Sequence, residues 1–162
     1  MEIKIRKAKI DDLEPIVSLS NEFGYNPEKS EVENKLSKFS LNPDEAIYVA
    51  ENEKIIGWMH ISLVEPLESS SFVEIRGIVV NKEYRKKGIG TKLIETAEKW
   101  AKGKGCKKLR VRTNIIREET RKYYRNLDFI SKKTQEVFEK GIQKLLFKFV
   151  LLNKLLIIID VG

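Results

Sequence analysis

Hydrophobic and polar positions follow two different periods along the chain, and the changes of period separate predicted strands from predicted helices. Six segments have the alternation or short apolar runs that are typical of strands, namely 2–10, 46–51, 55–64, 72–80, 107–113 and 129–139. Four segments repeat apolar residues every three or four positions, namely about 11–23, 28–39, 90–101 and 118–126. This order of strands and helices predicts an α/β or α+β domain.

Local signals support several of these elements. Only three residues, 52–54, separate the second and third predicted strands, which indicates a hairpin. Asp11 and Glu14 resemble a capping box at the start of the first helix. The third helix has an apolar stripe of Leu93, Ile94, Ala97, Trp100 and Ala101, whereas no internal repeat is visible.

Length and composition predict a single domain outside the secretory pathway. A chain of 162 residues with 41% hydrophobic residues is sufficient for one sizeable core. Cys106 is the only cysteine, which excludes an internal disulfide and a cysteine-based zinc site, so we expect a packing residue and no metal. The first residues lack the apolar segment of a signal peptide, and we therefore expect a cytoplasmic protein.

Charge is distributed unevenly between the two parts of the chain. Residues 1–74 contain 8 Lys and Arg against 15 Asp and Glu, whereas residues 75–162 contain 23 against 9. A protein that only coats a polyanion has little use for an acidic part. The asymmetry favours a protein that brings an anionic and a cationic ligand together, although solvated surface charge explains most such counts.

The segment YRKKGIGTKL, residues 84–93, has the features of a phosphate-binding turn. It follows a predicted strand and opens a predicted helix near Gly90, where free backbone N–H groups and the helix dipole favour anions. Glycines allow a ligand to approach the backbone closely. The segment matches neither a Walker loop nor a dinucleotide fingerprint, and a solvated basic loop is the alternative.

The run Arg85-x-x-Gly88-x-Gly90 resembles the Q/R-x-x-G-x-G/A motif of the GNAT superfamily of N-acetyltransferases, and NIIREETRKYYRNLDF resembles a later motif of that family. The resemblance implies a mixed, twisted, mostly antiparallel sheet flanked by helices, with a splay between two central parallel strands. It implies acetyl-coenzyme A as co-substrate. Its pyrophosphate would be held by the N–H groups of Lys86, Lys87, Gly88, Ile89, Gly90 and Thr91, and its pantetheine arm would pair with Ile78, Val79 and Val80.

The same resemblance assigns a proton donor. Tyr124 occupies the position of the family's tyrosine, and a phenol is a suitable donor to a departing thiolate because its ordinary pKa is about 10. Its neighbour Tyr123 lies about 100° round the helix and is expected to be a packing residue. Asp128 stands where the family usually has Gly, which suggests a different turn at the end of this helix.

The general base is less defined by the sequence. Glu74 lies eleven residues before Arg85, the separation at which histone-type members of the family place a catalytic glutamate. Arg76 shares its predicted strand face, so a structural ion pair is an equally good interpretation. His60, the only histidine, is more readily interpreted as a packed or solvent-facing residue than as a base.

Further cations precede and follow the start of the predicted helix 118–126. In relatives with this motif the region lies along coenzyme A, so Asn114 and Arg117 are expected to contact it. Other basic residues could reach its phosphates or simply form an exposed face, namely Arg121, Lys122 and Arg125.

The sequence therefore predicts a GNAT-like acetyltransferase domain over residues 1–140, which moves an acetyl group directly to a primary amine of a small molecule or protein. Residues 141–162 form an apolar extension, too short for a membrane span, that either packs on the domain or forms a homodimer contact. A different acyl-coenzyme A is one alternative. A phosphate-reading nucleic-acid-binding module is the other, although the acidic part and Tyr124 argue against a nucleic-acid partner.

Overall fold

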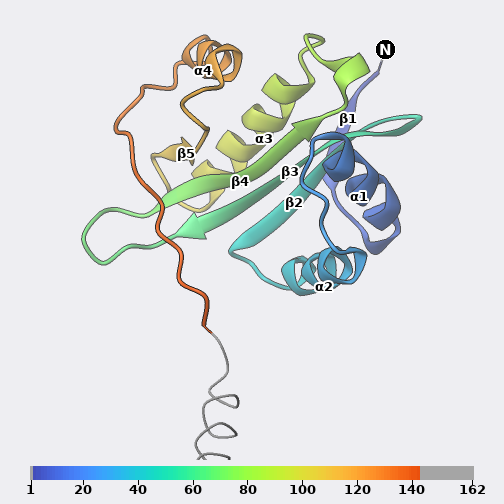
Figure 1. The fold of residues 1–162 in the computed structure, drawn as a ribbon, viewed down its shortest axis with the longest axis horizontal. Helices are drawn as coiled ribbons and strands as arrows, with labels where there is room; N and C mark the ends of the chain where they lie inside the picture. Colours follow the sequence, from blue (N-terminus) through green and yellow to red (C-terminus); the bar gives the residue numbers. More distant parts are fainter. Residues whose placement is uncertain (1, 143–162) are drawn as a thin grey trace, which may run out of the picture. The chain divides into compact units, whose positions relative to one another are not determined.

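The computed structural model describes residues 2–142, and the chain divides into two compact units, Met1–Phe129 and Ile130–Gly162. The first unit contains a five-stranded sheet in the order β1-β2-β3-β4-β5 (Figure 1). Its strands are β1 (Lys4–Lys7), β2 (Glu45–Asn52), β3 (Lys54–Val64), β4 (Phe72–Val80) and β5 (Leu109–Val111). The first four strands are antiparallel, and β5 is parallel to β4. The predicted mixed, mostly antiparallel sheet is confirmed.

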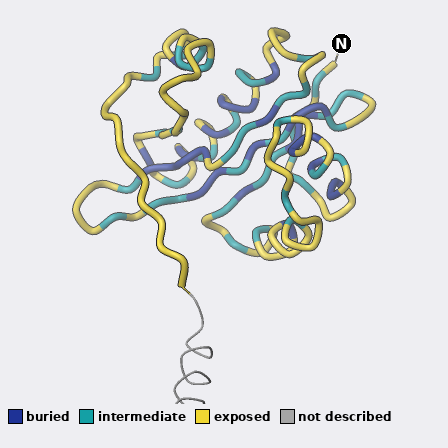
Figure 2. Tube along the Cα trace, viewed as in Figure 1, coloured by how far each residue is buried: buried dark blue, intermediate teal, exposed yellow. Residues whose placement is uncertain are grey.

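Helices cover both faces of this sheet and bury two separate cores, as Figure 2 shows. On one face lie α1 (Leu13–Glu22) and α2 (Lys29–Ser40), packed against Val49 and Trp58. On the other lies α3 (Ile89–Gly103), whose apolar stripe packs on Met59 and Ile61 of β3. A fourth helix, α4 (Glu118–Arg125), follows β5 and contributes Tyr124 to the core that contains α3.

The pairing of β4 with its neighbouring strands is irregular in two places. The pairing with β3 shifts at His60, which lies opposite Gly77, while Ile61 lies opposite Ile75, so Arg76 forms a bulge. The pairing with β5 covers only Val73–Ile75. Among the described residues no strand pairs with that side of β4 beyond Ile75, and this gap matches the predicted splay. The prediction placed the splay between two central strands, whereas β5 is the edge strand of the described sheet.

The start of α1 differs from the predicted capping box of Asp11 and Glu14. Asp12 rather than Asp11 holds the turn, because its carboxylate accepts the backbone N–H of Lys9 at 2.8 Å. The same carboxylate accepts two hydrogen bonds from Arg6, at 2.7 and 2.9 Å. Glu14 pairs instead with Lys29 at the start of α2. A buried carboxylate requires a charged partner, and Arg6 on β1 supplies it to Asp12 but not to Asp11.

The Arg6–Asp12 pair should make folding stability depend on acid pH. Hydrogen bonds from Arg6 hold the pKa of Asp12 below its ordinary value of 3.8, so the contribution is complete above that value and is lost as the pH falls through the lower, folded-state pKa. We expect Asp12→Asn to lower the free energy of unfolding by roughly 1 to 3 kcal/mol at pH 7. Urea unfolding between pH 2 and pH 7 measures both effects. A loss in Asp12→Asn that is equally large at all pH values would contradict this role.

The described part of the second unit departs from the prediction. Residues 130–142 form neither helix nor strand, so the predicted strand 129–139 is wrong. Ile130, Val137, Phe138 and Ile142 are exposed, and the charged residues between them leave too few apolar positions for a half-buried strand. The interpretation of residues 141–162 as a packed extension or dimer contact falls almost wholly outside the described residues. None of the helices in the described part of the chain is long and apolar enough to cross a membrane.

Candidate coenzyme site at the start of α3

The loop between β4 and α3 has the backbone of an anion cradle. Lys86 and Gly88 both adopt left-handed conformations, with φ of 58° and 77°. Gly88 caps α3, its carbonyl accepting the N–H of Lys92 at 3.0 Å. No acceptor among the described residues meets the N–H groups from Lys86 to Thr91. These groups, together with the positive end of a 15-residue helix, provide donors and a field for a phosphate.

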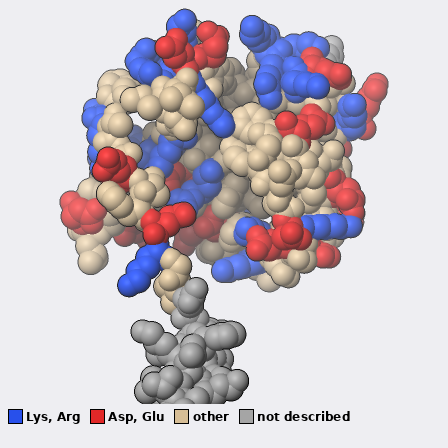
Figure 3. Space-filling view, in the orientation of Figure 1, with Lys and Arg blue, Asp and Glu red and all other residues tan. Residues whose placement is uncertain are grey.

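A hollow of about 150 Å³ adjoins this loop at the end of β4. Its lining comes from α1, from the end of β4 and from the segment that follows it, namely Leu19, Glu22, Phe23, Val79, Val80, Asn81, Lys82 and Arg85. The Arg85 Nε donates to the Val80 carbonyl at 3.1 Å, which fixes the guanidinium beside the splay. In the space-filling view the surface is hollowed between α1 and α4, with Lys and Arg side chains along the hollow (Figure 3).

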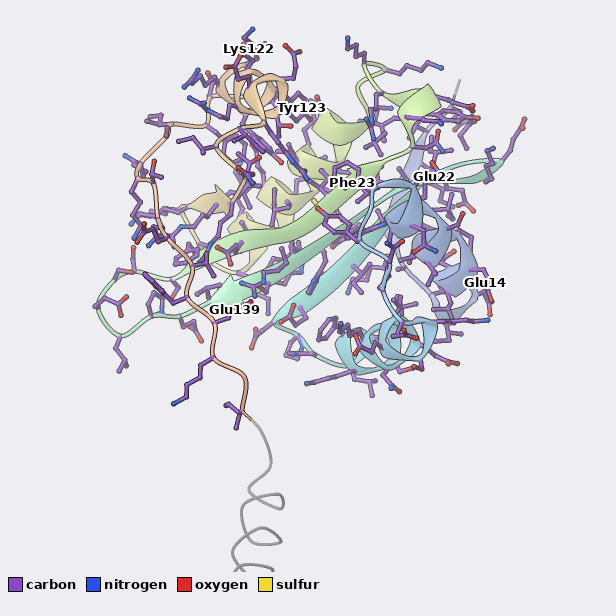
Figure 4. All side chains as sticks on the ribbon, in the orientation of Figure 1. Glu14, Glu22, Phe23, Lys122, Tyr123 and Glu139 are labelled. Atoms are coloured by element: carbon purple, nitrogen blue, oxygen red, sulfur yellow. The ribbon has the colours of Figure 1, made fainter. Side chains whose placement is uncertain are left out.

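Phe23, at the end of α1, joins two cations of the site. The guanidinium carbons of Arg85 and Arg117 lie 5.6 and 5.3 Å from its ring centre, so cations from the loop and from the start of α4 meet on one ring. Figure 4 shows Phe23 on the side of α1 that faces α4, where Tyr123 lies. Sequence reasoning missed Phe23 and Glu22, because their apolar and acidic characters are ordinary for the end of an amphipathic helix.

Tyr124 is held firmly in the hydrophobic core that contains α3. It is 8% exposed, and its ring lies 5.4 Å from that of Phe129 in an edge-on arrangement. Burial, followed by the neighbouring Tyr123 and Tyr25, raises the pKa of Tyr124 to about 12. The phenol therefore keeps its proton throughout the neutral range, and only its hydroxyl distinguishes it chemically from a packing phenylalanine.

Tyr123 packs against the core, as predicted, and its hydroxyl also limits the space at the start of α3. Its buried hydroxyl lies against the first turn of α3, beside Gly90 and the Thr91 side chain. A Cβ built on Gly90 would stand 2.6 Å from the Tyr123 hydroxyl and 3.4 Å from the ring carbon that bears it. A side chain at Gly90 would therefore displace the Tyr123 hydroxyl. The Gly90 position itself allows Ala in the motif that the loop resembles.

The contact of Gly90 with Tyr123 can be tested by a double-mutant cycle. We expect Gly90→Ala to lower the free energy of unfolding by about 1 to 3 kcal/mol through overpacking. In a Tyr123→Phe background the hydroxyl is absent, and the same substitution should be neutral or stabilising because Ala favours helix. Urea unfolding of the four proteins gives the coupling energy. An equal cost of Gly90→Ala in both backgrounds would show that the hydroxyl does not restrict this position.

The end of α4 keeps the usual turn although Asp128 replaces glycine. Asp128 has φ of 61°, and the N–H of Phe129 donates to the Tyr124 carbonyl at 3.0 Å. The expectation of a different turn is therefore wrong. Asp is among the few residues that tolerate the left-handed conformation, so the geometry that places Phe129 against Tyr124 is preserved.

The residues directly before α4 form a turn that is held by hydrogen bonds. The Asn114 side-chain oxygen accepts the N–H of Ile116 at 3.1 Å, and its carbonyl accepts the N–H of Arg117 at 3.1 Å. Arg121 donates to the Ile115 carbonyl at 3.1 Å. Asn114 therefore positions Arg117 at the start of α4. Contacts of these residues with coenzyme A stay a prediction.

Glu74 is buried at the centre of an ion-pair cluster. It is 2% exposed, and its oxygens accept hydrogen bonds from Arg112 at 2.8 Å and from Arg76. The ion-pair interpretation of Glu74 therefore matches the geometry. His60 lies on the same sheet face, stacked on Phe39 with ring centres 4.9 Å apart and its Nε2 2.6 Å from Glu45. Burial lowers the pKa of His60, and the Glu45 carboxylate opposes this shift.

Free N–H groups at a helix start beside a splayed pair of parallel strands are suited to an extended ligand that carries phosphate. The chain belongs to the acetyltransferase (GNAT) family, whose model matches residues 10–129. No curated protein sequence matches the chain significantly. In the described residues no group of three or more His, Cys, Asp and Glu side chains could hold a metal ion.

Solved structures share this fold at low sequence identity. AAC(6')-Iy, in complex with a bisubstrate analogue of coenzyme A and acetylneamine, is 20% identical with a TM-score of 0.78, over 88% of this chain and 100% of that one. Glucosamine-6-phosphate N-acetyltransferase from Arabidopsis thaliana is 21% identical with a TM-score of 0.75, over 87% and 100%. A transcriptional regulator from Bacillus halodurans is 24% identical with a TM-score of 0.74, over 87% and 100%.

Proposed function

We propose that the protein is an acetyl-coenzyme A-dependent N-acetyltransferase that moves an acetyl group directly to a primary amine of a small molecule or protein. The observation that carries the proposal is the cradle of N–H groups from Lys86 to Thr91 at the start of α3, which meet no acceptor among the described residues. The cradle lies beside the edge of β4, which no described strand covers beyond Ile75. The cradle fits a pyrophosphate, and the edge fits an extended arm that pairs with Ile78–Val80. The N-acetyltransferases among the similar structures support this choice of co-substrate.

Transfer requires two proton movements, which this chain's residues must serve. The amine nitrogen attacks the thioester carbonyl carbon, the carbon–sulfur bond breaks, and the amine loses a proton while the departing thiolate gains one. Tyr124 is the proposed donor to sulfur. A phenol with a pKa of about 12 is protonated at neutral pH and so offers a hydrogen bond as negative charge develops on the sulfur.

Glu74 has two possible roles, namely removing the amine proton or holding two arginines in place. Glu74 is the predicted base, but both of its oxygens already accept hydrogen bonds from arginines. If Glu74 removes the amine proton, Glu74→Gln should lower turnover about 10²- to 10⁴-fold. If it only holds the arginines, the variant should lower the melting temperature and leave the shape of the pH–rate profile unchanged. Rate profiles and melting curves of the same preparation decide between the two roles.

Two alternatives make different predictions for binding. A nucleic-acid-binding module would use the same cations around Arg85 and Arg117 to contact phosphates, and another acyl donor would use the same cradle. Acetyl-coenzyme A should raise the melting temperature by several degrees at saturating concentration, because it binds only the native state. An oligonucleotide should not. Stabilisation by the oligonucleotide and not by acetyl-coenzyme A would overturn the proposed function. A larger increase in melting temperature with a longer acyl-coenzyme A would indicate that the longer acyl-coenzyme A is the donor.

A further inference from the structure

A buried carboxylate, that of Glu74, holds two arginines next to the splay, namely Arg76 and Arg112. Arg76 comes from the bulge of β4 and Arg112 directly follows β5, so Glu74 joins the two parallel strands where their pairing ends. The Arg112 side chain uses its Nε, at 2.8 Å from Glu74, and Arg76 uses one terminal nitrogen. The remaining N–H groups of both guanidinium groups have no partner among the described residues.

Both guanidinium groups face solvent although the carboxylate between them does not. The exposed fractions of the side chains are 51% for Arg76, 66% for Arg112 and 3% for Glu74. Arg110, the register partner of Glu74 on β5, adds a third cation, stacked 3.7 Å above the ring of Phe72. The three cations outnumber the two carboxylates near them, Glu74 and the Glu45 that pairs with His60.

The Arg76–Arg112 pair lies where the acceptor would bind if the proposed function is correct. From the cradle, the unpaired edge of β4 runs back from Val80 to Arg76, about 13 Å at the rise of a strand. An extended arm that follows this edge brings its reactive end toward the bulge. His60 lies opposite Gly77, next to the bulge, and the charged groups near it are Glu45 of β2, Lys35 of α2 and Arg76.

We propose that the acceptor is a primary amine that also carries a carboxylate or phosphate, and that Arg76 and Arg112 bind this anionic group. The inference rests on the proposed function and specifies its substrate class. A guanidinium offers N–H donors in a planar fork that matches carboxylate and phosphate oxygens. Glu74 acts as a positioning residue, because it fixes both forks before the ligand arrives and so reduces the side-chain entropy lost on binding.

This substrate class differs from the one that the charge asymmetry alone favours. A purely cationic amine would meet the positive field of Arg76 and Arg112, and Glu74 is too fully engaged to attract it. An amine with an anionic group can place that group on the arginines and its nitrogen near the bulge. The preference should weaken with salt, since both guanidinium groups are more than half exposed.

Matched acceptor pairs test the proposal on the full chain. We would measure free thiol release from acetyl-coenzyme A with glucosamine 6-phosphate against glucosamine, ornithine against 1,4-diaminobutane, and arginine against agmatine. The anionic member should have the higher kcat/KM in at least one pair. Arg112→Gln should lower kcat/KM for that anionic member by about 10- to 100-fold, mainly through KM, and change its partner by less than about threefold. Arg112→Lys should retain part of the preference.

Controls separate binding of the anion from general effects. Lys102→Gln removes the same charge from the last turn of α3 and should leave the preference unchanged. A preference for the non-anionic member in every pair, or an equal loss for both members in Arg112→Gln, would overturn the anion site and leave the transferase intact.

If no amine is acetylated, the same compounds are tested by melting in the presence of coenzyme A. Stabilisation by an anionic amine that is lost in Arg112→Gln would support the anion site although the proposed reaction has failed. If no anionic amine stabilises the protein in this way, the anion site is overturned as well.

Discussion

Replacing Tyr124 by Phe should lower turnover by about 10²- to 10⁴-fold while acetyl-coenzyme A binds with nearly unchanged affinity. The substitution keeps the ring that packs on Phe129 and removes only the hydroxyl. If the hydroxyl donates to the departing sulfur, the loss falls on kcat, provided that chemistry limits the rate. Steady-state rates and coenzyme affinity of the parent and the variant measure this directly.

Two controls distinguish a proton donor from a packing residue. Tyr123→Phe removes the hydroxyl next door, which lies against Gly90, and should change turnover by only a few-fold. Tyr124→Ala should be costly in stability, by about 3 to 5 kcal/mol, because it empties a site in the core. Full activity in Tyr124→Phe would remove Tyr124 as the donor and leave solvent or another group to protonate the thiolate.

Gly88→Val should abolish coenzyme binding in a protein that still folds. Gly88 has φ of 77°, where a β-branched residue is strained by roughly 1 to 3 kcal/mol. A Cβ at Gly88 would meet no protein atom within 4 Å, so the side chain would project into the space beside the unpaired N–H groups. It would block the close approach of a phosphate and distort the cradle.

Gly105 provides a matched control for the backbone strain. It has φ of 71° and lies just beyond the end of α3, and a Cβ at this position would likewise have no neighbouring atom within 4 Å. Gly105→Val should therefore cost a similar free energy of unfolding and leave acetyl-coenzyme A affinity unchanged. If both variants fold and bind alike, the phosphate cradle is not at Gly88.

The pattern of hydrophobic and polar residues was sufficient to predict the helices and strands that bury an apolar face. The four helices and the first five strands follow from periods that a core requires, and the glycine loop is recognisable from its composition. The strand predicted at 129–139 failed because alternation among charged residues carries little information when no face is buried. Local propensity could not reveal that Asp12, and not Asp11, meets Arg6.

The site depended more on contacts between distant segments. Nothing in the sequence near Tyr123 indicates that its hydroxyl limits Gly90, and nothing near Phe23 indicates that two arginines meet on its ring. The sequence allowed two roles for Glu74, because Arg76 was visible on the same strand. Arg112 comes from a different strand, so its hydrogen bond to Glu74 required the fold.

The most direct test of the central claim is the product of the reaction. The protein is incubated with acetyl-coenzyme A and the amine panel, free thiol is followed with time, and the amines are examined by mass spectrometry. The account predicts amine-dependent thiol release and one acetyl group on the amine for each thiol released. Both should form about 10²- to 10⁴-fold more slowly in Tyr124→Phe and be lost in Gly88→Val. Thiol release that does not depend on any amine, or stabilisation by acetyl-coenzyme A that survives in Gly88→Val, would contradict it.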